Sequence, residues 1–279
     1  GTNGVSRYDK AAKPKWAKLL AMDKTARLES ITSLSDASAV AAGEVGAVDE
    51  RDGLVVRVDV TGALKWQTKV DGGADEALFA VRARQQGDVV FAGVRHDNIA
   101  VYSHFFGAMS ATGKVAWTRA PAQPDLGSLD TITVLADDSL AMSGSRVVEG
   151  LERSLLVRTD GVGIRWWDRV FSAHYNDAYK PQRDALHAFA DGSLFLGASG
   201  NINGGKYRRF YGIYTDPLGF ASCNGPGKCL AKVGNGACDD SNPCTIDWCD
   251  ADKGCQNTAS AGTVCGEGKV CSEGKCAAK

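Results

Sequence analysis

Short apolar or alternating segments recur along residues 1–222 and are separated by residues typical of turns. One such segment is ITSLSDASAVAAGEV (residues 31–45), and another is ALFAVRARQQGDVVFAGV (residues 77–94). Asp-Gly, Gly-Asp and Thr-Gly pairs lie at the positions where tight hairpins need a positive φ. No segment sustains the 3.6-residue period of an amphipathic helix. The pattern therefore predicts an all-β region of short antiparallel strands joined by hairpins.

Tryptophan recurs near the end of each repeat, at intervals of 50, 51 and 49 residues. A fixed period near 50 residues is typical of repeat proteins, and four strands per repeat match one blade of a β-propeller. A large ring on the fourth strand would pack between neighbouring sheets, although a row of such rings can also form an aromatic binding platform. We expect blade packing from Trp16, Trp66, Trp117 and Trp166.

The repeats amount to four full units and one half. Residues 4–20 match only the second half of a unit. A closed propeller often completes a blade with strands from the other terminus, and none remain here. The sequence thus predicts β-propeller-type, four-stranded antiparallel blades that belong to a larger ring or are completed by a partner chain. We place these blades at residues 1–222 and a small disulfide-rich module at residues 223–279.

Cysteine is confined to the last 57 residues. That segment has few apolar residues, so disulfides rather than core burial are expected to stabilise it, in an oxidising compartment. Zinc binding is the alternative, but the spacing lacks paired C-x2-4-C ligands and the segment lacks histidine. Nine is an odd number, so one thiol is left over or pairs with another chain. The candidates are Cys223, Cys229, Cys238, Cys244, Cys249, Cys255, Cys265, Cys271 and Cys276.

Charge and hydropathy exclude some classes of partner. The chain has 32 basic and 33 acidic residues and a formal net charge of -1, so net charge does not steer it toward nucleic acid. No apolar run approaches the roughly 20 residues of a transmembrane helix. Together with the cysteines, these observations predict an extracellular or cell-surface protein whose partner is a protein, extracellular matrix or a glycan.

Two polar clusters are candidate binding sites. Five aspartates crowd the cysteine-rich segment and could hold Ca²⁺, although no EF-hand pattern is present and turn hydrogen bonds are the alternative role. They are Asp239, Asp240, Asp247, Asp250 and Asp252. A polar, aromatic loop between the third and fourth units could contact a glycan or a protein, or simply join two blades. It contains His174, Tyr175, Asn176, Asp177 and Tyr179.

An acidic residue precedes the first strand of every full unit. The four are Glu29, Glu76, Asp130 and Asp184. First strands line the central channel of a propeller, so these carboxylates could form a ring that raises their pKa values or attracts a cation. The alternative is a repeated hydrogen bond to backbone N–H groups where each blade begins.

Several motifs resemble known families. Residues 72–94, followed by a Thr-Gly…Trp strand, resemble the repeats of bacterial secreted propellers of the SBBP type, and Asp59 to Trp66 resembles the docking motif of quinoprotein-like propellers. The run from Cys238 to Cys255 resembles the cysteine-rich extracellular repeat of slime-mould matrix proteins, which is also common in myxobacterial surface proteins. These resemblances imply a propeller and an extracellular matrix or surface role.

No catalytic motif accompanies these resemblances. G-x-S-x-G, P-loop, Rossmann and paired-histidine motifs are absent from the sequence. We therefore predict that the chain is not an enzyme but a scaffold or interaction protein, part of an extracellular assembly, with no cofactor other than calcium. The alternatives are a lectin-like propeller that binds carbohydrate or matrix and, with less support, a quinoprotein-like oxidoreductase.

Overall fold

The computed structural model describes residues 4–84, 87–98, 101–120, 126–148, 150–171, 185–202, 207–219, 242–250, 254–259, 264–266 and 269–278. Every regular element in these residues is a β-strand, which confirms the predicted all-β fold. The chain divides into two compact units: Gly1–Ala120 with Ser128–Val134, and Pro121–Gly127 with Leu135–Lys279. The boundary expected between residues 222 and 223 lies outside the described residues, so the domain division of the sequence analysis stays a prediction.

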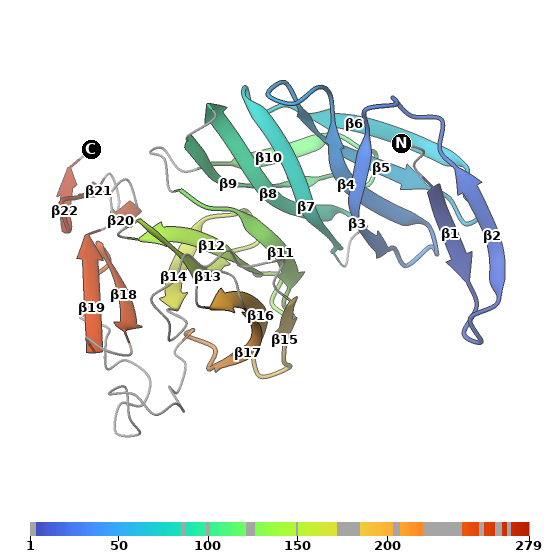
Figure 1. Cartoon of the computed structure of the whole chain (residues 1–279). Helices are drawn as coiled ribbons and strands as arrows, with labels where there is room; N and C mark the ends of the chain where they lie inside the picture. Colours follow the sequence, from blue (N-terminus) through green and yellow to red (C-terminus); the bar gives the residue numbers. More distant parts are fainter. Residues whose placement is uncertain are drawn as a thin grey trace. The chain divides into compact units, whose positions relative to one another are not determined.

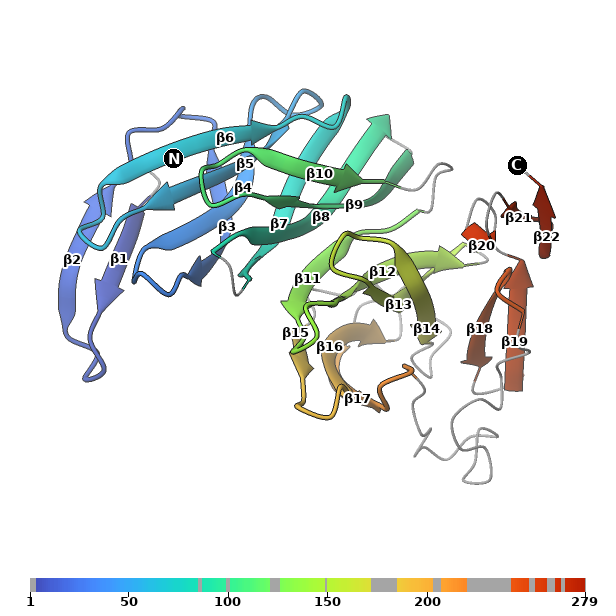
Figure 2. The same cartoon turned by 180° about the vertical axis from the view of Figure 1, so that it is seen from behind.

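The first unit contains two four-stranded antiparallel sheets and a two-stranded one (Figures 1 and 2). The strand orders β3-β4-β5-β6 and β10-β9-β8-β7 follow the chain, as blades of a propeller do. The half-unit is the pair β1-β2. The bounds are β1 (Gly4–Tyr8), β2 (Pro14–Leu19), β3 (Arg27–Ser33), β4 (Ala39–Val45), β5 (Asp52–Val58), β6 (Leu64–Val70), β7 (Asp75–Ala83), β8 (Val89–Asn98), β9 (Val101–Met109) and β10 (Val115–Arg119).

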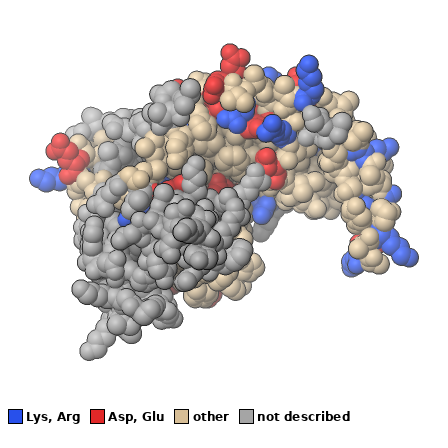
Figure 3. All heavy atoms as spheres, viewed as in Figure 1, with Lys and Arg blue, Asp and Glu red and all other residues tan. Residues whose placement is uncertain are grey.

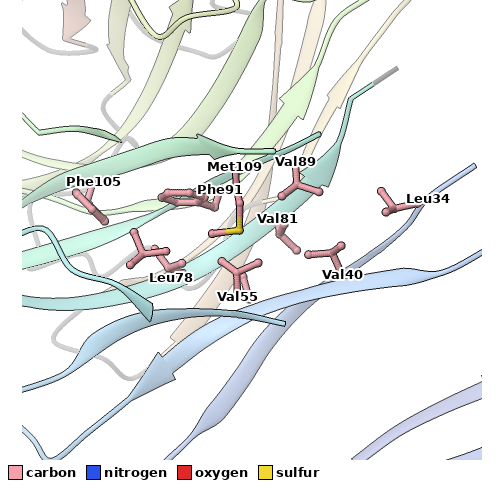
Figure 4. Close-up of a cluster of buried hydrophobic side chains, with 11 residues drawn as sticks. Leu34, Val40, Val55, Leu78, Val81, Val89, Phe91, Phe105 and Met109 are labelled. Carbon is pink, nitrogen blue, oxygen red and sulfur yellow. The ribbon is translucent and has the colours of Figure 1, made fainter. Parts of the chain in front are cut away.

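The inner strands of the first full blade are buried on both faces. On β4 and β5, Val40 and Val55 pack toward the next blade, where they meet Leu78, Phe91 and other apolar side chains (Figure 4). The residues that alternate with them, including Leu54, pack in a second cluster with Leu20 and Met22. Burial on both faces explains why these strands read as nearly continuous apolar runs, whereas β6 alternates between exposed and less exposed residues.

The remaining strands complete the blades and the C-terminal segment. The third blade, β11-β12-β13-β14, belongs to a sheet with the order β11-β12-β13-β14-β18-β19, and β14 pairs with β18 in parallel through Val170 and Trp248. The fourth blade is described as three strands, β15-β16-β17. The bounds are β11 (Leu129–Val134), β12 (Leu140–Val148), β13 (Leu151–Thr159), β14 (Arg165–Phe171), β15 (Ala185–Ala188), β16 (Leu194–Ile202), β17 (Tyr207–Thr215), β18 (Thr245–Asp250), β19 (Gly254–Ala259), β20 (Val264–Gly266), β21 (Lys269–Ser272) and β22 (Lys275–Ala278).

Tryptophans at the ends of the blades lie on glycines of the following blade. Trp16 lies against Gly62, and its indole N–H donates to the carbonyl oxygen of Val60 at 2.8 Å. Trp66 lies against Gly113 in the same way. Both glycines have positive φ values in the turn between the third and fourth strands. Trp117 occupies the corresponding position on β10, and its ring makes an edge-on contact with the ring of Phe106.

The expected packing residue in the third blade is wrong by one position. Trp66 is opposite Arg57 on the neighbouring strand, and the corresponding residue opposite Arg158 is Trp167 rather than Trp166. The ring of Trp167 contacts Gly219, whereas Trp166 falls at the strand irregularity and is 54% exposed. A signal in the sequence identifies the correct residue, because Trp167, like Trp66 and Trp117, lies four positions after its own turn glycine.

Candidate functional site

A network of charged side chains in the first unit lies at the ends of β4 and β8 and at the starts of β5 and β7. The Arg51 guanidinium donates to both carboxylate oxygens of Asp75, at 2.8 and 2.6 Å, and to Glu44 at 2.9 Å. Asp75 also accepts the backbone N–H of Arg51 at 2.8 Å. These charge-assisted bonds hold the pKa of Asp75 below its usual range. The network fixes the start of β5 relative to the start of β7.

A histidine adjoins this ion pair. His96 is opposite Asp75 in the β7–β8 register, and its ring lies 5.7 Å from that of Tyr102 between centroids. Burial lowers the pKa of His96, while the carboxylate of Asp75 opposes that shift. At neutral pH His96 is therefore mainly the uncharged imidazole, which can both donate and accept a hydrogen bond.

Beside the ion pair, three carboxyl groups from two neighbouring blades converge. Asp52 is the first residue of β5, Asp71 follows β6, and Glu76 is the second residue of β7. One carboxylate oxygen of each lies within 4.8 Å of the other two. The blades approach closely here because Gly53 has no side chain; a Cβ atom on it would lie 3.0 Å from Leu78.

Glu76 is the buried member of this carboxyl cluster. Its side chain has no exposed surface, and its Oε1 atom accepts the N–H of Ala74 at 2.9 Å. Its Oε2 atom has no hydrogen-bond partner among the described residues. Burial raises the pKa of Glu76 to about 7, against the opposing effect of backbone N–H groups in the turn. A carboxyl group with that pKa changes its charge near neutral pH.

The other two carboxyl groups are more accessible. Asp52 pairs with Lys69, whose Nζ atom is 2.8 Å from Oδ2, but the Lys69 side chain is 63% exposed. Asp71 is exposed, and its Oδ1 atom accepts the N–H of Gly73 at 2.7 Å. The arrangement thus brings two accessible carboxylates and one buried carboxyl group together, the ligand type that hard cations prefer.

The carboxyl cluster differs from the suggested ring of four acidic residues, for which a repeated hydrogen bond at the start of each blade was the alternative. Of the four, only Glu76 is part of it. Glu29 lies at the register shift of β3, and Asp130 accepts a hydrogen bond from the hydroxyl of Ser128 at 2.8 Å. Asp184 lies outside the described residues. The place of Glu76 before a first strand marks it in the sequence, but no pattern marks Asp52 and Asp71, because their proximity to Glu76 depends on how the two blades pack.

Two disulfides lie in the C-terminal segment. Cys244 bonds to Cys271, and Cys265 bonds to Cys276. Their sulfurs are therefore not thiolates that could bind zinc. Cys249 and Cys255 are opposite each other in the β18–β19 register, but the structure does not describe their side chains. The other three candidates, Cys223, Cys229 and Cys238, lie outside the described residues.

The remaining candidates stay predictions. The loop with His174, Tyr175, Asn176, Asp177 and Tyr179 lies outside the described residues. So do Asp239, Asp240 and Asp252 of the suggested calcium site, while only the backbone of Asp247 and Asp250 is described, in β18.

Basic side chains gather over β1 and β2, at the right of Figure 3. Residues 4–19 contain five Lys or Arg residues and one acidic residue, Asp9. The Asp9 carboxylate accepts the N–H groups of Ala11 and Lys13, so it is occupied in stabilising the hairpin turn. A shallow hollow of about 520 Å³ beside this turn is lined by Arg7, Tyr8, Asp9, Lys10, Ala11 and Lys15.

Comparison with known proteins identifies the C-terminal repeat. A family model described as the Dictyostelium (slime mold) repeat matches residues 237–259, in agreement with the resemblance found in the sequence. No curated protein matches the chain. The similarity to SBBP-type propellers is not supported by any of these matches and stays a prediction.

Solved structures resemble the chain at low identity, and two of them are described below. One is an endo-arabinase from Bacteroides thetaiotaomicron, with 8% identity, a TM-score of 0.41, and coverage of 73% of this chain and 81% of that chain. The other is Sqt1 from Chaetomium thermophilum, with 11% identity, a TM-score of 0.33, and coverage of 63% of this chain. This chain spans 41% of the Sqt1 chain.

The prediction that the chain is not an enzyme needs correction. The solved structures that the chain resembles include an endo-arabinase, and the absence of catalytic motifs from the sequence does not exclude catalysis. At 8% identity the likeness concerns the fold alone and assigns no reaction to this chain. Within the described residues, no helix has the length and apolar character to cross a membrane. The disulfides and the slime-mould repeat indicate a protein of extracellular type.

Proposed function

We propose that the chain is a secreted or surface-displayed bacterial interaction protein. Its blades act as the scaffold, and its disulfide-rich segment acts as a spacer or contact point in an extracellular assembly. The observation that carries this proposal is the pair of disulfides, Cys244–Cys271 and Cys265–Cys276, within 33 residues of chain. Such bonds persist in oxidising compartments.

Thiol counting tests the extracellular part of the proposal. The full chain is produced with export to an oxidising compartment, denatured without reductant, alkylated and weighed. If eight of the nine cysteines are paired within the chain, each chain should carry one adduct, or none where the ninth cysteine is linked to another molecule. More than five adducts would contradict the two disulfides, because they alone protect four of the nine cysteines. A control sample that is reduced first should carry nine adducts.

The odd cysteine supports covalent assembly. With eight cysteines paired within the chain, the ninth can link to a neighbouring molecule. Non-reducing electrophoresis of the exported protein should then show a dimer or a mixed complex that reductant dissolves. A monomer whose ninth thiol is fully alkylated would exclude covalent linkage, and assembly would have to be non-covalent.

The basic surface over β1 and β2 favours an acidic partner, either a protein or a matrix glycan. Three exposed lysines, Lys10, Lys13 and Lys15, lie at or beside the hairpin turn. Binding to an immobilised acidic polysaccharide should weaken with salt and should fall when Lys10 and Lys15 are changed to Glu. Lys24→Glu and Lys65→Glu, at exposed positions elsewhere in the first unit, are the matched control. Equal binding by both variants would exclude this surface.

A further inference from the structure

We propose that Asp52, Asp71 and Glu76 form a binding site for a hard divalent cation of the Ca²⁺ or Mg²⁺ type, in the first unit. This site is separate from the calcium site expected in the cysteine-rich segment, and it does not depend on the proposed function. It rests on two independent observations. The first is the convergence of three carboxyl groups, with one oxygen of each within 4.8 Å of the others.

The second observation is an unsatisfied buried oxygen. The Glu76 side chain is completely buried, yet its Oε2 atom has no hydrogen-bond partner in the described part of the chain. Buried carboxylate oxygens normally have a partner, and an orphan indicates a missing ligand or a functional role. A cation beside Asp52 and Asp71 would supply that partner.

The backbone and the other charges are compatible with a cation. The turn between β6 and β7 is held by the N–H groups of Gly73 and Ala74, so it presents two of the three carboxyl groups. A Cβ atom on Gly72 would lie 2.8 Å from Oε1 of Glu76, so a side chain here would press on the carboxyl group. Two positive charges act on the cluster: Lys69 pairs with Asp52, and the charge of Arg95 on β8 lowers the pKa of Glu76.

The positive charges of Lys69 and Arg95 do not fully neutralise the three carboxylates. Three ionised carboxylates carry one negative charge more than Lys69 and Arg95 balance. Lys69 is mostly exposed and can turn away from Asp52, and Arg95 also pairs with Asp97 at 2.6 Å. Carboxylate oxygens with water in the remaining positions are ligands that Ca²⁺ takes, and Mg²⁺ usually keeps several waters beside one or two carboxylates.

Titration calorimetry tests the site. The full chain, freed of metal by a chelator, is titrated with CaCl₂ and separately with MgCl₂ at pH 8. Saturable binding of at least one of the two ions is expected. Asp71→Asn should weaken it at least about tenfold. Asp71 is exposed, so this variant should fold normally, as circular dichroism can verify.

Two further variants complete the test. Glu76→Gln keeps the size of the buried side chain and should also weaken binding at least about tenfold. Glu50→Gln, at an exposed position in the loop before β5, is the matched control and should leave binding unchanged. The proposal is overturned if neither ion binds at millimolar concentration, or if binding persists unchanged in folded Asp71→Asn.

Discussion

The indole ring of Trp66 covers Gly113 of the following blade, where a Cβ atom would lie 2.8 Å from the ring. The indole N–H also donates to the carbonyl oxygen of Ala111, at 3.3 Å. Gly113 has a φ of 85°, a conformation that residues with a side chain rarely adopt. The Trp66 side chain therefore joins the last strand of one blade to a turn of the next.

Gly113→Ala should destabilise the first unit. The new methyl group would be strained at positive φ and would also collide with Trp66, which together should cost about 2–4 kcal/mol. Urea unfolding followed by tryptophan fluorescence measures this change. Gly87→Ala is the matched control, because its φ is 81° but its Cβ would meet only Ala111, at 3.9 Å. Equal losses in the two variants would show that the Trp66 contact contributes nothing.

The two adjacent tryptophans of the third blade should differ in importance. Trp167→Ala removes the ring that contacts Gly219 and packs on the cluster with Leu156 and Leu194, and should cost about 2 kcal/mol or more. Trp166→Ala removes a half-exposed ring that lies over the Arg158 guanidinium, and should cost less than about 1 kcal/mol. Chemical unfolding of both variants measures the two losses of stability. A larger loss in Trp166→Ala would contradict the register.

Acid should weaken the third blade through Asp168. Burial alone would raise the pKa of Asp168, but the charges of Arg146 and Arg165, with a hydrogen bond from Arg146, hold it at about 2. A lowered pKa means that this stabilisation is present above pH 4 and is lost as the pH falls toward 2. The loss should reach about 2 kcal/mol.

Asp168→Asn tests that acid dependence. The variant should lose about 3 kcal/mol at pH 7, because Arg146 stays buried, and this difference from the wild type should shrink toward pH 2. Urea unfolding of the variant and the wild type at several pH values from 7 to 2 measures the loss at pH 7 and its change with pH. Asp137→Asn, which affects an ion pair that is half exposed, should cost about 1 kcal/mol or less. A constant difference between Asp168→Asn and wild type across this range would refute the assignment.

The disulfides of the C-terminal segment should protect it from proteolysis. Cys244–Cys271 closes a loop of 27 residues and both cysteines are buried, whereas Cys265–Cys276 closes one of 11. Paired Cys→Ser changes at Cys244 and Cys271 should remove about 3 kcal/mol and accelerate trypsin cleavage after Lys269 and Lys275. The same changes at Cys265 and Cys276 should have a smaller effect. Unchanged cleavage in both variants would mean that the bonds do not stabilise the segment.

Local patterns were enough to predict the strands of the blades, but not the parallel pairing of β18 with β14, which adds two strands to the sheet of the third blade. Continuous apolar runs such as AVAAGEV and GLVVRV, with a tryptophan four positions after a turn glycine, identify the strands of a blade. They do so because strand pairing within a blade joins neighbours in sequence, through short hairpins. The cysteine-rich segment was equally visible, since composition alone shows that it needs cross-links.

Contacts between blades were decided only by the tertiary structure. The ring of Trp167 packs on Gly219, a residue 52 positions further along the chain and in the next blade. Likewise Asp52, Asp71 and Glu76 are spread over 25 residues, and Gly53 has to admit Leu78 before their carboxyl groups can meet. A pattern along the chain records which residues prefer burial, but the burial of Glu76 and its missing partner depend on the packing of one sheet against the next.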